Sequence, residues 1–525
     1  MKVQLIHPPL YLNVHAMTAL RPSAPLGLAY IAAAIREAGH DVTVIDAVAE
    51  APEQVTPGKR PQLFALGLRT GEIVERIDPE ADVIGITNMW SFSWPLVREI
   101  IEQIHSAWPE KTIVCGGEHF TGLPEYSMEQ APLDFIILGE GEEGAVELLD
   151  AIEKNRAQPG SVDISSIPSV VYRDANRSPV RSLQVRPRNK GVDDIAWPAW
   201  DLFDMDTYND HNYVAGVKKG ITVPILATRG CPYQCTYCSS PNMWTTRWYA
   251  RDPKDVVDEI QHYKDSYGAV SFPFQDLTAI LKRDWVISFC NELLDRDLQV
   301  TWQFPSGTRC EVIDDEVANL LDRSGGRSLA LAPESGSERT RKLIKKMMKT
   351  DSLLNAVRSS VKHNLNVTAF IVIGFPHDIP EDFKKTRQLV RKLALLGIDD
   401  IAVGFFFPIP NTQLYHELIE EGRISLNEDF LLTPIFANEK RLLPENNYCD
   451  HMTARQVTRA KYSILLSFYG TSFLVRPWRI ISILWNALRG KETRKLESFL
   501  IDIRRNIGVW WRGKFERRKS PATTP

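Results

Sequence analysis

Gly230-Cys231-Pro232-Tyr233-Gln234-Cys235-Thr236-Tyr237-Cys238 holds three of the seven cysteines in this chain of 525 residues. Three thiolates separated by three and by two residues on one loop can surround a single metal centre, and Gly230 and Pro232 suit the turn. A closed structural zinc site needs four ligands, usually in two separated pairs. No second pair is formed by the remaining cysteines, Cys115, Cys290, Cys310 and Cys449. The pattern therefore favours an iron–sulfur cube with one iron lacking a protein ligand, over an incomplete zinc knuckle or three unrelated cysteines.

The cysteine loop comes directly after the first of six apolar stretches with strand character, all between residues 221 and 425. The predicted strands are Ile221–Thr228, Val270–Phe274, Val300–Phe304, Ser328–Leu331, Val367–Ile373 and Ile401–Phe407. Helical stretches such as Pro253–Tyr267, Asp284–Leu298 and Glu381–Leu396 lie between them. Six consecutive βα units favour a partial (β/α)6 barrel with its site at the carboxyl ends of the strands.

Residues 1–150 show a separate alternation of short strands with helices at Leu26–Ala38 and Pro95–Ala107. The predicted strands are Val3–Ile6, Asp41–Asp46, Val83–Thr87, Thr112–Cys115 and Phe135–Leu138. This βαβ order predicts an α/β domain with a parallel, doubly wound sheet, whose ligands bind at the carboxyl ends of the strands. We expect residues 151–220 to form a connector and residues 426–525 to form a mostly helical C-terminal region.

Composition and charge limit the classes of protein that remain. Sixty-two Lys and Arg against 66 Asp and Glu give a net charge of −4, which argues against a nucleic-acid partner. The chain has no run of about 18 uninterrupted apolar residues, and Met1–Leu10 lacks the architecture of a signal peptide. The cysteines are too few and too unevenly placed for a disulfide scaffold, so we expect a cytoplasmic protein.

The cysteine motif resembles that of the radical S-adenosylmethionine (SAM) superfamily, CxxxCxxC with an aromatic residue, here Tyr237, before the last cysteine. The resemblance implies a [4Fe–4S] cluster on Cys231, Cys235 and Cys238, with SAM chelating the free iron. Reduction of the cluster would then cleave SAM to a 5′-deoxyadenosyl radical, which removes hydrogen from an unactivated carbon.

The resemblance also implies that residues at the barrel-strand ends bind SAM. Glu334 would hold the ribose or the ammonium group, Arg309 would offset the carboxylate, and Gly374 would let the backbone approach the adenine. The full set of predicted SAM-binding residues is Tyr237, Asp276, Arg309, Glu334, Ser335 and Gly374. The alternative for each polar residue is a strand-end cap that binds no ligand.

The whole arrangement, a doubly wound domain ahead of a radical SAM barrel, resembles the cobalamin (B12)-binding class of that superfamily. The resemblance implies that the backbone at Gly116-Gly117 approaches the corrin edge or the nucleotide tail. The full set of predicted cobalamin-binding residues is Thr87, Asn88, Gly116, Gly117, Gly139, Glu140 and Gly141. The alternative is a vestigial domain that packs on the barrel and binds nothing.

The sequence departs from the usual cobalamin fingerprint, because the pattern DxHxxG occurs nowhere in the chain. Cobalamin is therefore expected to bind without a histidine on cobalt. The remaining candidates for ligation are His7, His15 and His119, although a lone histidine at a strand end more often serves as a hydrogen-bonding residue.

The chain ends in a basic region, with 16 Lys or Arg against four Asp or Glu from residue 451 onward. Between Pro477 and Arg489, one narrow polar stripe interrupts a helix that is otherwise apolar and includes Trp478 and Trp485; the stripe consists of Arg479, Ser482, Asn486 and Arg489. An apolar seam follows at Leu496, Leu500, Ile503, Ile507 and Trp510, with Arg494, Lys495, Arg504, Arg505 and Arg512 around it.

Basic amphipathic helices with tryptophans suit a membrane surface, which would point to a lipid or another poorly soluble substrate. In the other interpretation, both helices cap the barrel and their basic residues face solvent.

The leading hypothesis is a B12-dependent radical SAM methyltransferase acting on an unactivated carbon of a small molecule or lipid. One SAM would supply the radical, and methylcobalamin, remade from a second SAM, would supply the methyl group. The electron would come from an external donor such as flavodoxin or ferredoxin. The alternatives are a cyclase or oxidative tailoring enzyme resembling the anaerobic magnesium-protoporphyrin ester cyclases, and a non-catalytic cobalamin or iron–sulfur sensor. A methylthiotransferase is disfavoured, because only Cys115 lies in the first 230 residues.

Overall fold

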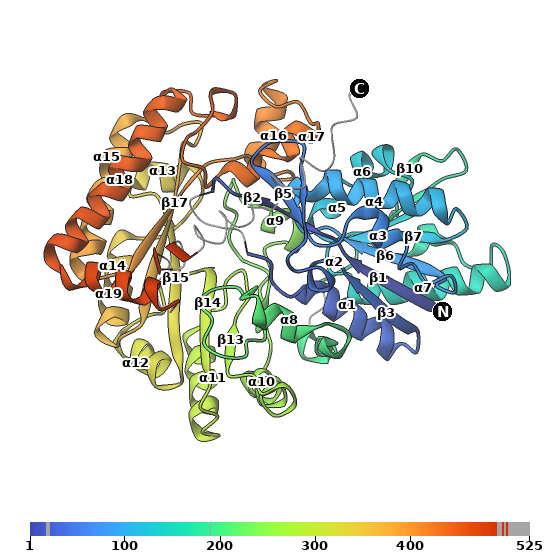
Figure 1. The fold of residues 1–525 in the computed structure, drawn as a ribbon, viewed down its shortest axis with the longest axis horizontal. Coiled ribbons are helices and arrows are strands. Elements are labelled where there is room, and N and C mark those ends of the chain that lie inside the picture. The colour runs from blue at the N-terminus through green and yellow to red at the C-terminus, as the bar shows by residue number, and fades with distance from the viewer. Residues whose placement is uncertain (17–20, 189–190, 491–495, 498–499, 502–525) are drawn as a thin grey trace.

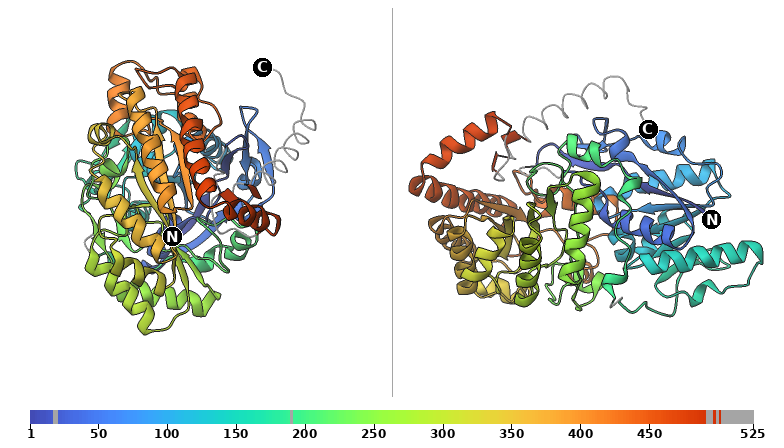
Figure 2. Two further views of the ribbon diagram at one scale, coloured as in Figure 1. Left: turned by 90° about the vertical axis from the view of Figure 1, so that its left-hand side faces the viewer. Right: turned by 90° about the horizontal axis from the view of Figure 1, so that it is seen from below.

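Two parallel sheets organise the chain, and helices surround both of them (Figure 1). The computed structural model describes residues 1–16, 21–188, 191–490, 496–497 and 500–501. The N-terminal sheet and the barrel sheet lie side by side in all three views, and the last two described helices, Ala454–Val475 (α18) and Trp478–Leu488 (α19), lie on the far side of the barrel (Figures 1 and 2). The predicted fold class, a doubly wound domain followed by a partial barrel and a helical region, is confirmed.

The N-terminal sheet contains the five parallel strands that the sequence predicts. Their order is β3-β1-β6-β7-β8, and they comprise Asp41–Asp46 (β3), Lys2–His7 (β1), Val83–Thr87 (β6), Thr112–Gly116 (β7) and Phe135–Ile137 (β8). Helices cover both faces of this sheet, among them Leu26–Glu37 (α1), Thr70–Val74 (α3), Trp94–Ala107 (α4) and Glu142–Ala157 (α7). Helices α1, α3 and α4 lie between parallel strands because parallel strands need crossover connections, whereas α7 leads from β8 toward an antiparallel strand, Val170–Arg173.

The sheet extends into the stretch that we expected to be a connector. Val170–Arg173 (β9) pairs antiparallel with β8, and Pro179–Arg181 (β10) pairs antiparallel with β9. The segment after β10 then runs along the boundary between the two sheets, where Arg186 and Arg188 form ion pairs with glutamates of the N-terminal domain.

A small antiparallel sheet, which the sequence pattern did not predict, lies beside the first. Its strands are Leu10–Asn13 (β2), Leu63–Leu66 (β5) and Val55–Pro57 (β4). Asn13 donates from Nδ2 to the carboxylate of Glu439 at 3.1 Å, and Ala16 forms a bridge with Glu439. This sheet therefore ties the N-terminal domain to the C-terminal region.

The barrel sheet has five parallel strands in chain order: Ser271–Pro273 (β13), Thr301–Thr308 (β14), Gly326–Glu334 (β15), Asn366–Ile373 (β16) and Asp400–Phe405 (β17). Its helices include Pro253–Tyr267 (α10), Arg283–Asp295 (α11), Asp315–Arg323 (α12), Thr350–Lys362 (α14) and Pro380–Leu396 (α15). The prediction of a first continuous strand at Ile221–Thr228 is wrong. That segment lies beside β13 and forms isolated parallel bridges at Thr222 and Ile225. Val223 and Ile225 donate to the carbonyls of Ser271 and Pro273, but Pro273 of β13 has no N–H to donate in return, so the ladder is interrupted there.

The C-terminal region is helical, with Gln413–Glu420 (α16), Glu428–Leu431 (α17), Ala454–Val475 (α18) and Trp478–Leu488 (α19). Helix α18 packs along α15 and against β17, and α19 follows it after a turn. Of the predicted apolar seam, Leu496 and Leu500 are described, whereas Ile503, Ile507, Trp510 and the basic residues around them lie outside the described residues. No helix within the described ranges is long and apolar enough to cross a membrane.

Gly117, at the end of β7, is the glycine on which this part of the fold depends most directly. Its φ is +106°, and a Cβ atom there would lie 2.8 Å from the carbonyl oxygen of Asn88. At neighbouring Gly116, a Cβ atom would approach only the carbonyl oxygen of Ile137, at 3.8 Å. Position 117 therefore requires glycine, whereas position 116 has room for a Cβ atom.

We expect Gly117→Ala to lower the melting temperature clearly, because a left-handed backbone alone costs roughly 1–3 kcal/mol and the backbone clash adds to it. Gly116→Ala is the matched control and should change the melting temperature little. Thermal unfolding followed by circular dichroism measures both, and equal effects of the two substitutions would contradict this geometry.

Candidate functional site

The cysteine loop lies between the short strand Thr228–Arg229 (β11), which pairs with Tyr249–Ala250 (β12), and the helix Ser240–Trp244 (α9). Cys231, Cys235 and Cys238 are all free thiols and partly exposed. The backbone N–H of Thr236 donates to the carbonyl of Ile344 at 3.1 Å, and its carbonyl accepts from the N–H of Leu414 at 2.9 Å. The loop is thus held between two other segments of the chain.

The thiols lie near enough to affect one another. Burial raises the pKa of Cys231, and it raises the pKa of Cys235 to about 11; in both cases the neighbouring Cys238 adds to the effect. Among the described residues, no three His, Cys, Asp or Glu side chains are arranged around one metal ion. Such an arrangement is not what a [4Fe–4S] cluster requires, because each thiolate binds a different iron. The donor set, three unpaired thiols on one loop, fits the cluster.

Tyr237, Glu334 and Gly374 come together beside this loop. The ring of Tyr237 meets that of Phe375 edge to face at 5.5 Å, and Phe375 directly follows Gly374. Burial, and then the Glu334 carboxylate, raises the pKa of Tyr237 well above its usual value. Gly374 has a φ of +89°, and its N–H donates to Asp378 at 3.0 Å, so the strand end turns sharply there.

Glu334, the last residue of β15, has a φ of +61° and is buried. Its carboxylate forms an ion pair with Lys346 at 3.2 Å. Burial lowers the pKa of Lys346, but the charge and hydrogen bond of Glu334 together with Cys235 outweigh burial, and the net shift is upward. Lys346 is a residue of the site that sequence analysis missed, because it belongs to no strand end and no motif.

Arg309 lies over the ring of Tyr233, with its guanidinium carbon 3.9 Å from the ring centre. It pairs with Glu311 and donates to the carbonyl of Met347 at 2.6 Å. Its Nη1 is buried and finds no hydrogen-bond partner among the described residues. A buried guanidinium nitrogen without a partner suits the binding of an anionic group such as the SAM carboxylate.

Asp276 and Ser335 make hydrogen bonds within the protein. Asp276 accepts from the hydroxyl of Thr228 at 2.5 Å and from the N–H of Ala227 at 3.2 Å, and burial raises its pKa to about 6. The hydroxyl of Ser335 lies 3.3 Å from that of Thr386 on α15. Both side chains therefore make the structural contacts of strand-end caps, and their role toward SAM stays a prediction.

At the N-terminal sheet, Thr87, Asn88, Gly116 and Gly117 form one strand-end cluster. Thr87 lies opposite Gly116 in the register of β6 and β7, and the N–H of Asn88 donates to the carbonyl of Gly116 at 2.9 Å. Asn88 is 1% exposed, and its Nδ2 has no hydrogen-bond partner in the described part of the chain. An unpaired amide beside the close backbone approach at Gly117 fits a polar ligand such as cobalamin.

The histidine candidates are occupied elsewhere or lie at the surface. His119 is fully buried against Trp94, with its ring nitrogens 3.0 Å from the hydroxyl of Ser91 and 3.3 Å from that of Ser127; burial lowers its pKa to about 3. His7 contacts Asp46 at 2.9 Å, and His15 is exposed.

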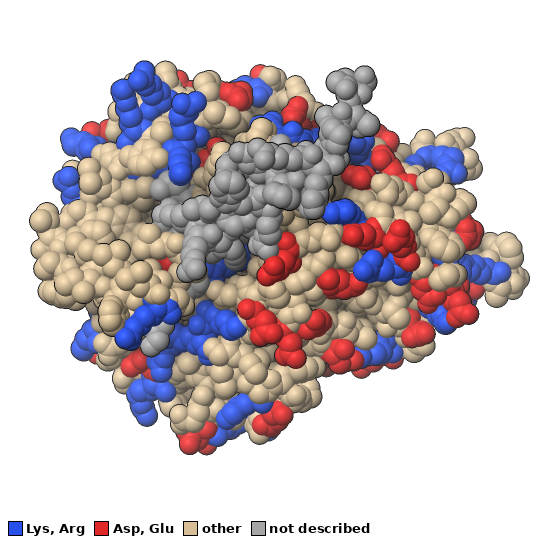
Figure 3. Space-filling view, in the orientation of Figure 1, with Lys and Arg blue, Asp and Glu red and all other residues tan. Residues whose placement is uncertain are grey.

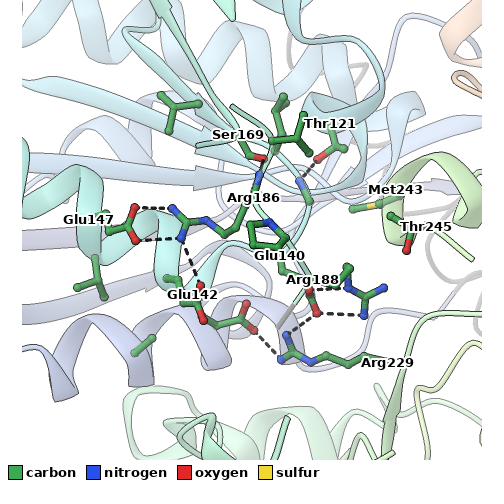
Figure 4. A pocket seen from close by; sticks show the side chains of 18 of the residues that line it. Thr121, Glu140, Glu142, Glu147, Ser169, Arg186, Arg188, Arg229, Met243 and Thr245 are labelled. Carbon is green, nitrogen blue, oxygen red and sulfur yellow. Dashed lines mark hydrogen bonds and ion pairs between the residues drawn. The ribbon is translucent and has the colours of Figure 1, made fainter. Parts of the chain in front are cut away.

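Glu140 is the centre of a buried ion-pair junction between the two sheets (Figure 4). Arg188 reaches its carboxylate at 2.6 Å and Arg229 at 3.3 Å, and Arg229 also pairs with Glu142 at 2.6 Å. Burial raises the pKa of Glu142, but Arg229 dominates and the net pKa is lowered. Gly141 lies against Ile31 of α1, where a Cβ atom would come within 2.8 Å of that side chain, and its role toward cobalamin stays a prediction.

A cavity of about 1040 Å³ opens beside this junction. Gly139 and Glu140 line it from the N-terminal domain, Met243 and Thr245 line it from the segment after the cysteine loop, and Arg186 adds a wall from the segment after β10 (Figure 4). Thr87, Asn88, Gly116 and Gly117 are not among its lining residues. The cavity is at the upper end of the usual range for small-molecule sites, so it can accept a bulky ligand.

The strand ends of the N-terminal sheet are joined directly to the cysteine loop. The carboxylate of Glu118, which follows Gly116-Gly117, accepts a hydrogen bond from the hydroxyl of Ser239, which follows Cys238. A Cβ atom on Gly139 would lie 3.7 Å from the carbonyl of Met243 in α9. The predicted cobalamin-binding edge therefore faces the predicted cluster loop. Arg188, Arg229 and Ser239, which make these contacts, carry no motif in the sequence.

Comparison with family models identifies both halves of this arrangement. Residues 14–149 match the B12 binding domain, and residues 225–390 match the radical SAM superfamily. The chain belongs to the B12-binding class of the radical SAM superfamily.

Relatives and solved structures agree with that assignment. An uncharacterized methyltransferase from Pyrococcus horikoshii is 28% identical over 89% of this chain and 92% of its own length. Cytidylyl-2-hydroxyethylphosphonate methyltransferase from Streptomyces wedmorensis is 25% identical, with 81% and 83% covered. The anaerobic magnesium-protoporphyrin IX monomethyl ester cyclase from Synechocystis is 26% identical, with 82% and 79% covered.

The fold is shared with two structures of lower identity. The radical SAM methyltransferase TsrM from Kitasatospora setae, with cobalamin and a [4Fe-4S] cluster bound, has a TM-score of 0.60 at 20% identity over 80% of this chain and 78% of its own. The cobalamin-dependent radical SAM enzyme OxsB has a TM-score of 0.66 at 13% identity over 100% and 82%.

In this radical SAM protein, single changes of Cys231, Cys235 or Cys238 to Ala should abolish the visible absorbance of the reconstituted cluster, because each removes one of three protein ligands. Cys290→Ala and Cys310→Ala remove buried thiols outside the loop and serve as controls that keep the cluster. Iron analysis and absorbance spectra test this. A cluster that survives loss of any loop cysteine would contradict the assignment.

Arg229→Met should lower the melting temperature by roughly 5 °C or more, because it leaves a buried carboxylate without its partner. Arg36→Met is the control, because it breaks the exposed ion pair with Asp201 and should change the melting temperature by less than about 2 °C. Calorimetry of both variants measures the difference, and equal shifts would show that the junction does not stabilise the fold.

Proposed function

We propose that this radical SAM enzyme is a B12-dependent methyltransferase that acts on an unactivated carbon. The observation that carries the proposal is the junction of the two strand-end edges. Glu118 follows Gly116-Gly117 in the B12-binding domain and contacts Ser239, which follows Cys238. This contact favours chemistry in which cobalamin and the cluster act on one substrate. The methyltransferases among the relatives support it further.

Two groups of side chains would hold the cofactors. Cys231, Cys235 and Cys238 would bind the [4Fe–4S] cluster, and the unpaired Nη1 of Arg309 and the carboxylate of Glu334 would bind the carboxylate and ammonium of SAM. When bound, these cofactors supply a carbon-centred radical, and methylcobalamin supplies a transferable methyl group.

The chain's own residues orient and enclose these groups. Lys346 pairs with the buried carboxylate of Glu334, which therefore has a partner of opposite charge away from water. The edge-to-face contact of Tyr237 with Phe375 covers the site beside the cluster loop and would keep water away from it. Asn88 and Gly117 would meet cobalamin at the facing edge, without a histidine from this domain on cobalt.

The alternative is a cyclase or oxidative tailoring activity. The 26% sequence identity with the Synechocystis cyclase supports this alternative. Both activities need one external electron per radical, which we expect from a flavodoxin or ferredoxin. They differ in the fate of the methyl group of SAM, because only the methyltransferase passes it to the product.

The test is incubation of the reconstituted, cobalamin-loaded enzyme with a reductant, methyl-labelled SAM and a cell extract. A methyltransferase should release 5′-deoxyadenosine and S-adenosylhomocysteine in comparable amounts and transfer the label to a product. Release of 5′-deoxyadenosine without S-adenosylhomocysteine or labelled product would support the cyclase class instead.

The matched control is Cys238→Ala, which should release no 5′-deoxyadenosine. If this variant still transfers the label, methyl transfer does not depend on the cluster and the proposal fails. An Arg309→Gln variant should raise the SAM concentration needed for half-maximal cleavage, because the buried guanidinium is lost.

A further inference from the structure

Helix α19 is turned so that three residues of its polar stripe, Arg479, Ser482 and Asn486, face the protein, whereas the fourth, Arg489, is exposed. Arg479 is 8% exposed, and its guanidinium donates to the carbonyls of Ile398 and Gly397, both at 2.7 Å. Asn486 donates to the carboxylate of Glu497 at 2.8 Å. The stripe that the sequence suggested would face solvent is thus used to attach the helix at the end of α15. The apolar side of the helix must then point outward.

The exposed residues confirm this orientation. Six large apolar side chains at the end of α18 and along α19 are each more than half exposed, and we call them the α19 face: Leu474, Trp478, Ile481, Leu484, Trp485 and Leu488. Single exposed apolar residues are ordinary, whereas a contiguous group marks an interaction surface. Figure 3 shows a broad area free of acidic and basic side chains over α18 and α19, at the left of the molecule.

The charge around the α19 face has one sign. No Asp or Glu occurs between Asp450 and Glu492, a range that contains α18 and α19 entirely. The guanidinium of Arg489 lies over the ring of Trp485, 4.2 Å from its centre. Lys and Arg side chains lie above and below the bare area in Figure 3. The surface is therefore apolar with a basic rim, which favours an anionic partner.

We propose that the α19 face docks on an anionic membrane surface. Tryptophan and aliphatic side chains bordered by Arg and Lys match the layers of a lipid interface, where acyl chains lie below negative headgroups. A second copy of this chain would bring two basic rims together and repel. The segment 502–525 offers no complementary charge either, because it contains seven Lys or Arg and two Asp or Glu.

The α19 face lies at the other end of the barrel from the predicted site of the reaction. Arg479 attaches α19 to Gly397 and Ile398, which lie before the first residue of β17. The cysteine loop and the SAM-binding residues lie at the opposite, carboxyl ends of the barrel strands. The membrane contact would therefore determine where the enzyme resides, and it does not itself form the mouth of the site.

The experiment is sedimentation of the full-length protein with vesicles of phosphatidylcholine alone and of phosphatidylcholine with phosphatidylglycerol, at low and high salt. We expect binding to the anionic vesicles that weakens as salt rises. The double change Ile481→Glu with Leu484→Glu should weaken this binding roughly tenfold or more, because two apolar side chains no longer enter the interface. Arg489→Gln should reduce the salt dependence.

Leu183→Glu is the matched control, because Leu183 is 96% exposed but lies outside the α19 face; it should bind like the wild type. The proposal is overturned if full-length protein ignores anionic vesicles, or if the double variant binds as well as the wild type. It is also overturned if light scattering shows a dimer that the double variant dissociates, because the face then belongs to a second copy. None of these measurements depends on methyl transfer.

Discussion

The relation between the two halves of this enzyme depends on the buried pairing of Arg229 with Glu140 and Glu142. Charges removed from water are tolerated only when they are paired, so the position of one side fixes that of the other. Arg229 lies two residues before Cys231, and Glu140 follows strand β8. The cluster loop is therefore placed by the N-terminal sheet as much as by the barrel.

This constraint explains why the edges of two separate sheets meet. In each sheet, the parallel strands bring their carboxyl ends to one edge, where loops are free to carry binding groups. Glu118 and Ser239 then connect the edges, and the cavity opens beside them. Strained backbone occurs at the same places, at Gly117 and at Glu334, both with positive φ. The surrounding packing must hold such residues, since an isolated loop would relax.

In helix α19, a polar residue of the sequence pattern is buried and the apolar side is exposed. The periodicity of its sequence separates a polar stripe from an apolar side, but periodicity cannot tell which of the two meets the protein. The carbonyls of Gly397 and Ile398 lack partners at the end of α15, and Arg479 supplies the donors. These hydrogen bonds hold the Arg479 side of the helix against the protein, so Trp478 and Trp485 on the other side are exposed.

The sequence by itself determined the elements and the chemistry of the cluster loop, because strand and helix periods and the spacing of Cys231, Cys235 and Cys238 are local properties. All five parallel strands of the first sheet and the last five of the barrel followed from them. The first barrel strand is not continuous, because Pro273 of the neighbouring strand lacks the N–H that the ladder needs between the bridges at Thr222 and Ile225. Only the tertiary structure decided that Arg229 and Ser239 join the domains, that Lys346 pairs with Glu334, and that Asp276 contacts Thr228. These roles depend on partners distant in the chain, such as Glu140 and Arg229, which are 89 positions apart, and no local pattern records them.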